Sequence, residues 1–247
     1  MRVSVEDNTD PVIAEVYERK NYLIRPPLAN LDGIVFVNSC IEPLPNRFVL
    51  DKLVAIADSK GIEPLVVFTK TDLKDAGDII DVYRNIGINV CLVNNLTGEG
   101  KEQVFDFLNG RVTAFVGNSG VGKSSLMNTL FPELSLETAH ISKKLGRGRH
   151  TTRQVEMYKL AGGYVADTPG FSTVETERYC KIPKGELDGA FREFAELTGK
   201  CQFANCAHIK EKGCAVRKAL SEGKIATSRY DSYVRMYEEA SKRNEWE

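Results

Sequence analysis

The chain has 247 residues, of which 42% are hydrophobic and 27% are charged. This composition is typical of a globular protein and excludes a chain that is disordered throughout. Its 33 basic and 34 acidic residues leave a formal net charge of -1, which excludes a uniformly basic nucleic-acid-binding protein.

The first 28 residues predict short extended segments, because small apolar pieces are separated by turn-forming residues. These pieces are VSV, PVIAEVYE and YLIRPP. From Asp32 onward the pattern changes, and apolar runs that predict buried strands alternate with segments that have helical apolar spacing.

The predicted strands cover residues 33–39, 63–70, 88–93 and 111–117. The predicted helices cover 47–61, part of 75–86, 101–108 and 123–131. This alternation indicates an α/β fold, with a mostly parallel sheet and helices on both faces. Two more strands are predicted at 155–160 and 163–168, and the chain beyond about Gly185 is predicted to be helical apart from a cysteine-rich segment.

Residues 117–125 carry the strongest motif, GNSGVGKSS, which matches G-x-x-x-x-G-K-[ST] between a predicted strand and a predicted helix. In such a loop the backbone N–H groups bind phosphate oxygens, Lys123 contacts the β- and γ-phosphates, and Ser124 holds Mg²⁺. The alternative, a glycine-rich turn that only begins a helix, is disfavoured by the complete motif. The candidate phosphate-binding residues are Gly117, Asn118, Ser119, Gly120, Val121, Gly122, Lys123, Ser124 and Ser125.

A second motif, Asp167-Thr168-Pro169-Gly170, ends the last predicted strand. Asp167 can hold Mg²⁺ through water, and the N–H of Gly170 can contact a γ-phosphate. Taken alone, the tetrapeptide is also compatible with an ordinary turn. Its position behind a strand favours a metal site.

A third motif, Thr69-Lys70-Thr71-Asp72, ends the second predicted strand and differs by one residue from the N-K-x-D motif of GTPases. There the aspartate accepts hydrogen bonds from two N–H donors of guanine. Adenine cannot supply that pair of donors, so Asp72 favours GTP over ATP. Without the other motifs this segment would be interpreted as a surface turn.

The order of these motifs is unusual, because the base motif precedes the phosphate loop, which precedes the 167–170 motif. Circular permutation can preserve a sheet when the original ends lie close together. With the segment RGRHTTR at 147–153, this order resembles the ribosome small-subunit-dependent GTPase A family, also called RsgA, YjeQ or YloQ. The resemblance runs from about Val12 to Tyr237.

The resemblance implies a GTPase that binds GTP or GDP with Mg²⁺ and is stimulated by the small ribosomal subunit. It implies a role late in the maturation of that subunit, with the subunit and its rRNA as partners of a monomeric, cytoplasmic protein. No apolar run approaches the roughly 18 residues needed to span a bilayer, so no membrane contact is expected. Two alternatives remain: a kinase or ATPase with the same phosphate loop, and a nucleotide-gated RNA-binding or ribosome-binding module with little hydrolysis.

The resemblance also assigns roles to individual residues. It gives guanine contacts to Thr69, Lys70 and Asp72, and makes Thr151 or Thr152 the switch threonine near Mg²⁺. The resulting magnesium set is Ser124, Thr152 and Asp167. Two positions depart from the family pattern: Thr69 replaces an asparagine, and Val93-Asn94-Asn95 replaces a Ser-x-Ala-like base contact.

The residue that activates water is less well defined. Phe171 follows Gly170, where many GTPases have a glutamine that orients the attacking water. The resemblance points instead to His150, which joins Lys123 and Thr152 as a candidate catalytic residue. A solvated or RNA-facing loop histidine is an equal alternative. The loop around it contains five cations that suit RNA phosphates: Lys143, Lys144, Arg147, Arg149 and Arg153.

The cysteine-rich segment has the pattern C-x4-C-x-H-x5-C, formed by Cys201, Cys206, His208 and Cys214. Three thiolates and one imidazole suit a closed, structural Zn²⁺ site. The spacing is not that of a common zinc finger, and reduced thiols in a helical hairpin are the alternative. A zinc-binding C-terminal domain is also what the family resemblance implies. Tyr230, Tyr233, Val234 and Tyr237 recur at helical spacing and are expected to pack against this segment, an RNA-stacking face being the alternative.

These observations predict three parts. Residues 1–29 are a remnant of an OB-fold domain, 30–175 are a circularly permuted GTPase domain, and 176–247 are a helical zinc-binding domain. An OB-type barrel needs about five strands, and residues 1–28 supply fewer, so the N-terminal part is expected to be truncated or naturally reduced.

Overall fold

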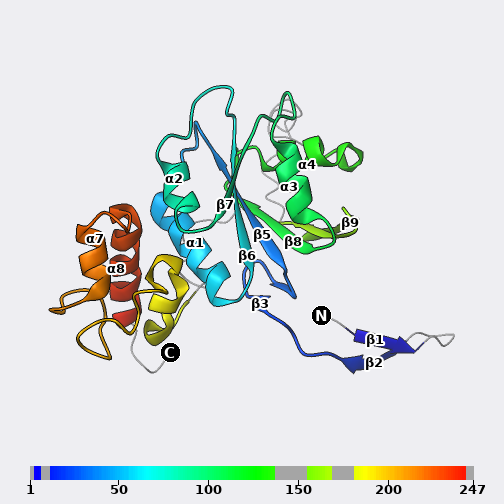
Figure 1. The fold of residues 1–247 in the computed structure, drawn as a ribbon. Helices are drawn as coiled ribbons and strands as arrows, with labels where there is room; N and C mark the ends of the chain where they lie inside the picture. The colour runs from blue at the N-terminus through cyan, green and yellow to red at the C-terminus, as the bar shows by residue number, and fades with distance from the viewer. Residues whose placement is uncertain (1–2, 7–11, 137–154, 169–180, 243–247) are drawn as a thin grey trace.

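The computed structural model describes residues 3–6, 12–136, 155–168 and 181–242. Its central sheet contains the strands β5 (Gly33–Ser39), β6 (Glu63–Thr69), β7 (Asn89–Val93), β8 (Val112–Gly117), β9 (Glu156–Leu160) and β10 (Gly163–Asp167). Their spatial order is β7-β6-β5-β8-β10-β9 (Figure 1). All neighbouring pairs are parallel except β9 and β10, which are antiparallel.

Four helices cover the two faces of this sheet. Their bounds are α1 (Arg47–Ser59), α2 (Ile79–Arg84), α3 (Lys101–Leu108) and α4 (Lys123–Leu130). Helices α1 and α2 share one apolar core with side chains such as Phe36, and α3 and α4 share the other with Val35 and Val37. Successive strand residues thus point to opposite faces, as a sheet buried on both sides requires. The predicted α/β fold with helices on both faces is confirmed.

The N-terminal residues form two small antiparallel sheets. Strands β1 (Val3–Glu6) and β2 (Val12–Val16) pair in one of them and extend away from the central sheet (Figure 1). Strands β3 (Tyr22–Leu23) and β4 (Leu28–Ala29) pair in the other. The buried side chain of Asn21 holds this second sheet next to β5, because it exchanges two hydrogen bonds of 2.8 and 2.9 Å with the backbone of Leu31.

The described C-terminal residues contain less α-helix than predicted. Three short 3-10 helices at Lys184–Glu186, Asp188–Ala190 and Arg192–Phe194 precede the α-helices α7 (Ala215–Ser221) and α8 (Thr227–Ser241). The prediction of a helical region from about Gly185 was therefore wrong for its first part. Gly185 and Gly189 lie within these turns, and glycine costs about 1 kcal/mol relative to alanine inside an α-helix.

A buried charge cluster joins α8 through α1 to the sheet that carries the three motifs. Arg229 of α8 is fully buried, and its guanidinium donates to Asp51 of α1 at 2.9 Å and to Glu193 at 2.7 Å. The Asp51 carboxylate also accepts hydrogen bonds from the hydroxyls of Tyr83 on α2 and Ser232 on α8. Burial lowers the pKa of Arg229, but the two carboxylates more than offset this and keep it above its usual range.

Replacement of Arg229 by methionine tests this cluster. Arg229→Met leaves the Asp51 and Glu193 carboxylates buried without their cation, so we expect the free energy of unfolding to fall by about 3–5 kcal/mol. Chemical denaturation measures this change. Lys218→Met removes an exposed cation from α7, where the side chain is 78% exposed, and should change stability by less than about 1 kcal/mol. Equal effects of the two substitutions would contradict the role given to the cluster.

Candidate functional site

The ends of three parallel strands carry the predicted phosphate, metal and base motifs. Parallel strands end at the same edge of a sheet, so the C-terminal residues Thr69 of β6, Gly117 of β8 and Asp167 of β10 lie along one edge. Ligands of open α/β sheets bind outside this edge. The motifs are therefore brought together despite their reversed order in the chain.

The phosphate-loop motif follows β8 and leads directly into α4. A Cβ at Gly117 would lie 2.7 Å from the carbonyl oxygen of Val37, so only glycine allows this close approach of β8 to β5. Gly120 and Gly122 adopt φ angles of +84° and +91°, which side-chain-bearing residues rarely reach. The glycines thus turn the chain sharply, and α4 begins at Lys123 with its N-terminus next to the loop.

The predicted base motif touches this loop. The hydroxyl of Thr69, which is fully buried, donates a hydrogen bond to the carbonyl of Val121. Lys70 has a φ of +60°, and its Nζ donates to the carbonyl of Glu42 at 2.7 Å. Thr71 is half-buried and Asp72 is exposed in the turn that follows. The carboxylate of Asp72 is therefore accessible to a ligand.

The predicted metal motif touches the same loop from the other side. Asp167 forms an ion pair with Lys123, and both side chains are largely buried, with exposed fractions of 20% and 12%. The next residue, Thr168, is fixed by a 2.6 Å hydrogen bond from its hydroxyl to the carbonyl of Phe115. Ser124 and Ser125 lie half-buried in the first turn of α4.

Some predicted site residues lie outside the described residues. These are the candidate catalytic residue His150, the switch threonines Thr151 and Thr152, and Gly170 of the metal motif. The basic loop that contains Lys143 to Arg153 lies outside them as well. Among the described candidates, Thr69 contacts the phosphate-loop motif at Val121, and Asp167 contacts it at Lys123.

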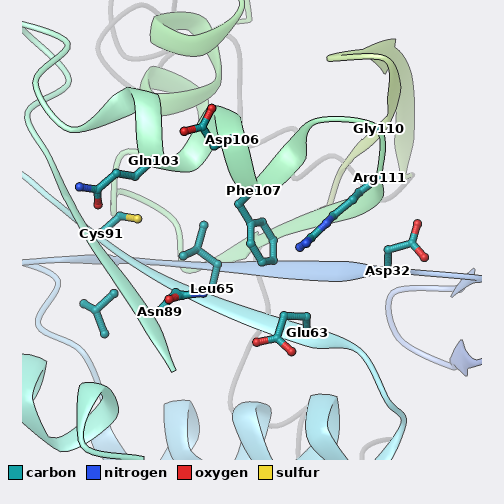
Figure 2. A pocket seen from close by; sticks show the side chains of 11 residues that line it. Asp32, Glu63, Leu65, Asn89, Cys91, Gln103, Asp106, Phe107, Gly110 and Arg111 are labelled. Atoms are coloured by element: carbon teal, nitrogen blue, oxygen red, sulfur yellow. The ribbon is translucent and has the colours of Figure 1, made fainter. Parts of the chain in front are cut away.

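A cavity of about 970 Å³ lies at the opposite edge of the sheet (Figure 2). Residues at or just before the starts of the strands line it, among them Glu63, Asn89 and Arg111, and the Arg111 guanidinium lies 4.9 Å from the centre of the Phe107 ring. The phosphate, base and metal motifs contribute no residue to its lining. The cavity is thus separate from the candidate nucleotide site.

The predicted zinc ligands converge in the C-terminal region. The ligand atoms of Cys201, Cys206, His208 and Cys214 all lie within 4.8 Å of one another. His208 Nδ1 is 3.6 Å from the sulfur of Cys201 and 3.4 Å from that of Cys214, and these two sulfurs are 3.9 Å apart. A tetrahedral Zn²⁺ with Zn–S of about 2.3 Å and Zn–N of about 2.0 Å separates sulfurs by roughly 3.8 Å, and sulfur from nitrogen by roughly 3.5 Å. The cluster fits one zinc ion.

Neighbouring polar groups hold the loop that carries His208. The carboxylate of Glu211 accepts hydrogen bonds from the backbone N–H groups of Ala207, Ile209 and Lys210. Burial raises the pKa of this carboxyl, but these backbone donors outweigh burial and lower it to about 2. The buried Nε2 of His208 has no hydrogen-bond partner among the described residues and lies 3.9 Å from Asp188 Oδ2, on the side of the ring opposite the thiols that Nδ1 faces.

The tyrosines of α8 also support this loop. The hydroxyl of Tyr230 donates to the carbonyl of His208 at 2.7 Å, and that of Tyr233 donates to the carbonyl of Ala207 at 2.9 Å. The rings of Tyr233 and Phe194 lie 4.8 Å apart in an edge-to-face arrangement. The prediction that residues of this helix pack against the cysteine segment is confirmed for Tyr230 and Tyr233.

Comparison with known proteins identifies the family. The sequence model of the RsgA GTPase family matches residues 16–177. The small ribosomal subunit biogenesis GTPase RsgA of Geobacillus sp. (strain WCH70) is 44% identical over 241 residues, which are 95% of this chain and 81% of that protein. The protein of the same name from Bacillus subtilis (strain 168) is 40% identical over 96% of this chain and 81% of its own length.

The solved structures agree with the sequences. YjeQ from Thermotoga maritima superposes with a TM-score of 0.80 at 32% identity, over 98% of this chain and 84% of that chain. YloQ, described as a circularly permuted GTPase, superposes with a TM-score of 0.78 at 34% identity, over 98% and 80% of the two chains. The chain belongs to the RsgA GTPase family. Its fold is that of a circularly permuted GTPase with a Cys/His cluster near the C-terminus.

Several supporting residues of this RsgA-family chain are not evident from its sequence. Glu211 lies inside the cysteine motif, between His208 and Cys214. An acidic residue at such a place could have indicated a carboxylate that accepts hydrogen bonds from the backbone of the ligand loop. Asn95 stands out in the sequence only as a departure from the family pattern, yet its side chain contacts the phosphate loop. Asp188 is far from the ligands in sequence, and nothing in the pattern points to it. Among the described residues, no helix has the length and apolar character needed to cross a membrane.

Loss of one cysteine ligand tests the zinc site. Cys214 is buried, and its sulfur also accepts the backbone N–H of Arg217 at the start of α7, so Cys214→Ser should reduce bound zinc from one ion per chain to near zero. Elemental analysis of purified protein measures the stoichiometry. Cys91→Ser changes a buried cysteine of β7 outside the cluster and should leave it at one. Full zinc occupancy in Cys214→Ser would contradict the assignment.

Proposed function

We propose that this chain binds GTP at the edge of the sheet where β6, β8 and β10 end, hydrolyses it, and acts in the assembly of the small ribosomal subunit. The observation that carries the proposal is the contact of the Thr69 hydroxyl with Val121, because it joins the base motif to the phosphate loop. The relatives that share about 40% of its residues are named as small ribosomal subunit biogenesis GTPases, which supports the biological role.

In this proposal each motif binds one part of the nucleotide. Asp72 accepts hydrogen bonds from the guanine N1 and N2 donors, next to Thr69 and Lys70. The backbone N–H groups of residues 118–123 and the Lys123 ammonium bind the β- and γ-phosphates. Ser124, Asp167 and Thr152 hold Mg²⁺, which neutralises charge on the phosphate oxygens when it is bound.

The ion pair between Lys123 and Asp167 has a role in this scheme. Without nucleotide, each side chain satisfies the charge of the other in a half-enclosed position. Entry of a triphosphate gives Lys123 a better partner, and Asp167 is then free to face the metal. The pair thus holds the two side chains in place before the nucleotide arrives. His150 is proposed, from the family resemblance alone, to act on the attacking water.

We also propose the division into residues 1–29, 30–175 and 176–247, together with contact with rRNA, a monomeric state and a location in the cytoplasm. The separate two-stranded sheet of β1 and β2 and the zinc cluster beyond residue 200 support the division. A local basic loop at 143–153 supports contact with RNA phosphates.

Substitution of Asp72 tests the guanine assignment. Asp72→Asn replaces an acceptor of two N–H groups by an amide that clashes with one of them. Each lost charge-assisted bond is worth about 1.5–3 kcal/mol, so GTP affinity should fall about 100-fold or more. Because xanthine has a carbonyl where guanine has its amino group, affinity for xanthosine triphosphate should rise. Competition binding measures both, with Asp75→Asn in the same loop as the control.

Hydrolysis with and without purified bacterial small ribosomal subunits tests the whole proposal. We expect slow GTP hydrolysis by the protein alone and at least about 10-fold faster hydrolysis with subunits, because the partner completes the catalytic set. His150→Ala should lower the stimulated rate about 100-fold while GTP affinity stays unchanged, as expected for a proton-transfer group. GTP binding without hydrolysis in either condition would instead favour the nucleotide-gated binding module. Displacement of GDP by ATP as readily as by GTP would refute the GTPase assignment.

A further inference from the structure

Asn95 lies in the loop between β7 and α3 and contacts the phosphate loop through its side chain. Its Nδ2 donates to the carbonyl of Gly122 at 3.2 Å. Its own backbone carbonyl lies 3.1 Å from the hydroxyl of Thr129 on α4, but that hydroxyl carries one proton and lies closer, at 2.8 Å, to the carbonyl of Ser125. The residue therefore bonds to the last peptide of the phosphate loop and packs against the helix that follows it.

Thr69 reaches the same place from β6. Its hydroxyl contacts the carbonyl of Val121, and Asn95 contacts the carbonyl of Gly122, so two side chains hold two consecutive carbonyls immediately before Lys123. A Cβ added to Gly122 would lie 3.0 Å from Asn95 Nδ2 and 3.2 Å from Thr69 Oγ1. Both side chains are thus closed tightly over Gly122, whose φ of +91° sets the direction of the chain into α4.

The chemistry fixes the orientation of the Asn95 amide. A carbonyl oxygen can only accept, so the group that faces Gly122 must be the NH₂ group. The oxygen Oδ1 then points elsewhere, and within the described residues it is buried with no hydrogen-bond partner. A buried unsatisfied oxygen costs about 1–3 kcal/mol, which is more than a single long hydrogen bond returns. Stability of the free protein alone does not explain this amide.

We propose that Asn95 is a positioning residue for nucleotide binding, which with Thr69 fixes the Val121–Gly122 peptides so that the loop N–H groups and Lys123 face the phosphates. This inference rests on the proposed binding of GTP at this edge. It also accounts for the two departures from the family pattern in the sequence. Position 69 has lost the amide of N-K-x-D, and position 95 has an amide where a small residue was expected. In this proposal the amide at position 95 takes the place of the amide that N-K-x-D has at position 69, because Asn95 and Thr69 contact consecutive carbonyls of the same segment.

A double-mutant cycle tests this exchange, with fluorescent GDP as the probe. Asn95→Ala should weaken GDP binding about 5- to 10-fold, mainly through faster dissociation, while the melting temperature without nucleotide does not fall. The double variant Thr69→Asn with Asn95→Ala should recover most of the affinity, because the amide returns to position 69. Asn95→Asp keeps the shape but places a carboxylate against the Gly122 carbonyl, and should weaken binding at least as much as alanine.

A control variant and the melting temperature distinguish a positioning role for Asn95 from a general loss of stability. Leu96→Ala, in the same loop and 87% exposed, should leave GDP binding unchanged. Unchanged GDP affinity in Asn95→Ala would overturn the proposal. A lower melting temperature of the nucleotide-free variant would also overturn it, because general destabilisation would then explain the weaker binding. Failure of Thr69→Asn to restore binding would overturn the exchange. If the unmodified protein binds GDP while Asn95→Ala binds equally well, only this inference fails; if the unmodified protein binds no guanine nucleotide, the proposed function fails and this inference with it.

Discussion

The parallel direction of the strands is the constraint on which the site depends. Strands β6, β5, β8 and β10 are neighbours in space and run the same way, so each delivers its C-terminal residue to one edge. Which strand comes first in the chain does not enter this geometry. A base motif at Thr69 can therefore precede a phosphate loop at Gly117 and still contact it. The hydrogen bond from Thr69 to Val121 is possible because both strands end at the same edge of the sheet.

The sequence predicted the sheet well because its strands are uniformly apolar and bounded by turn residues. The strand at Gly33–Ser39 and the helix at Lys101–Leu108 have the predicted bounds. The cysteine cluster was predicted because its motif is contiguous and chemically distinctive, and the phosphate-loop motif is recognisable in the sequence for the same reason. Contacts between distant segments were not predictable in this way. From the sequence, Arg229 would be predicted to lie on the exposed face of a polar helix. Its burial is explained only by ion pairs with Asp51 and Glu193, which are distant in the sequence.

A continuous series of contacts connects the proposed nucleotide edge of the sheet with the cysteine cluster through α1. The Lys70 ammonium holds the carbonyl of Glu42 in the loop before α1, and Pro43 of that loop lies beside Gly120 of the phosphate loop. The side chain of Asn46 caps α1, whose Asp51 binds Arg229 of α8. One turn later on α8, Tyr233 holds the loop of the zinc ligands. The C-terminal region is thus connected to the base side of the proposed nucleotide site by polar contacts, of which those of Asp51 with Arg229 are buried.

In this arrangement the cluster of zinc ligands has a structural role, because it holds together a segment that has no apolar core of its own. The loop from Cys201 to Cys214 contains little regular structure, so a metal can replace the apolar core that it lacks. Its closed set of four ligands leaves no position for substrate chemistry. The cluster fixes the loop to which Tyr230 and Tyr233 of α8 donate their hydrogen bonds. Because Arg229 lies on the same helix, the cluster also helps to place Arg229 against Asp51. An ordered loop around the cluster therefore favours the placement of Arg229. The placement of Arg229 in turn keeps the C-terminal region attached to α1, which lies next to the proposed nucleotide site.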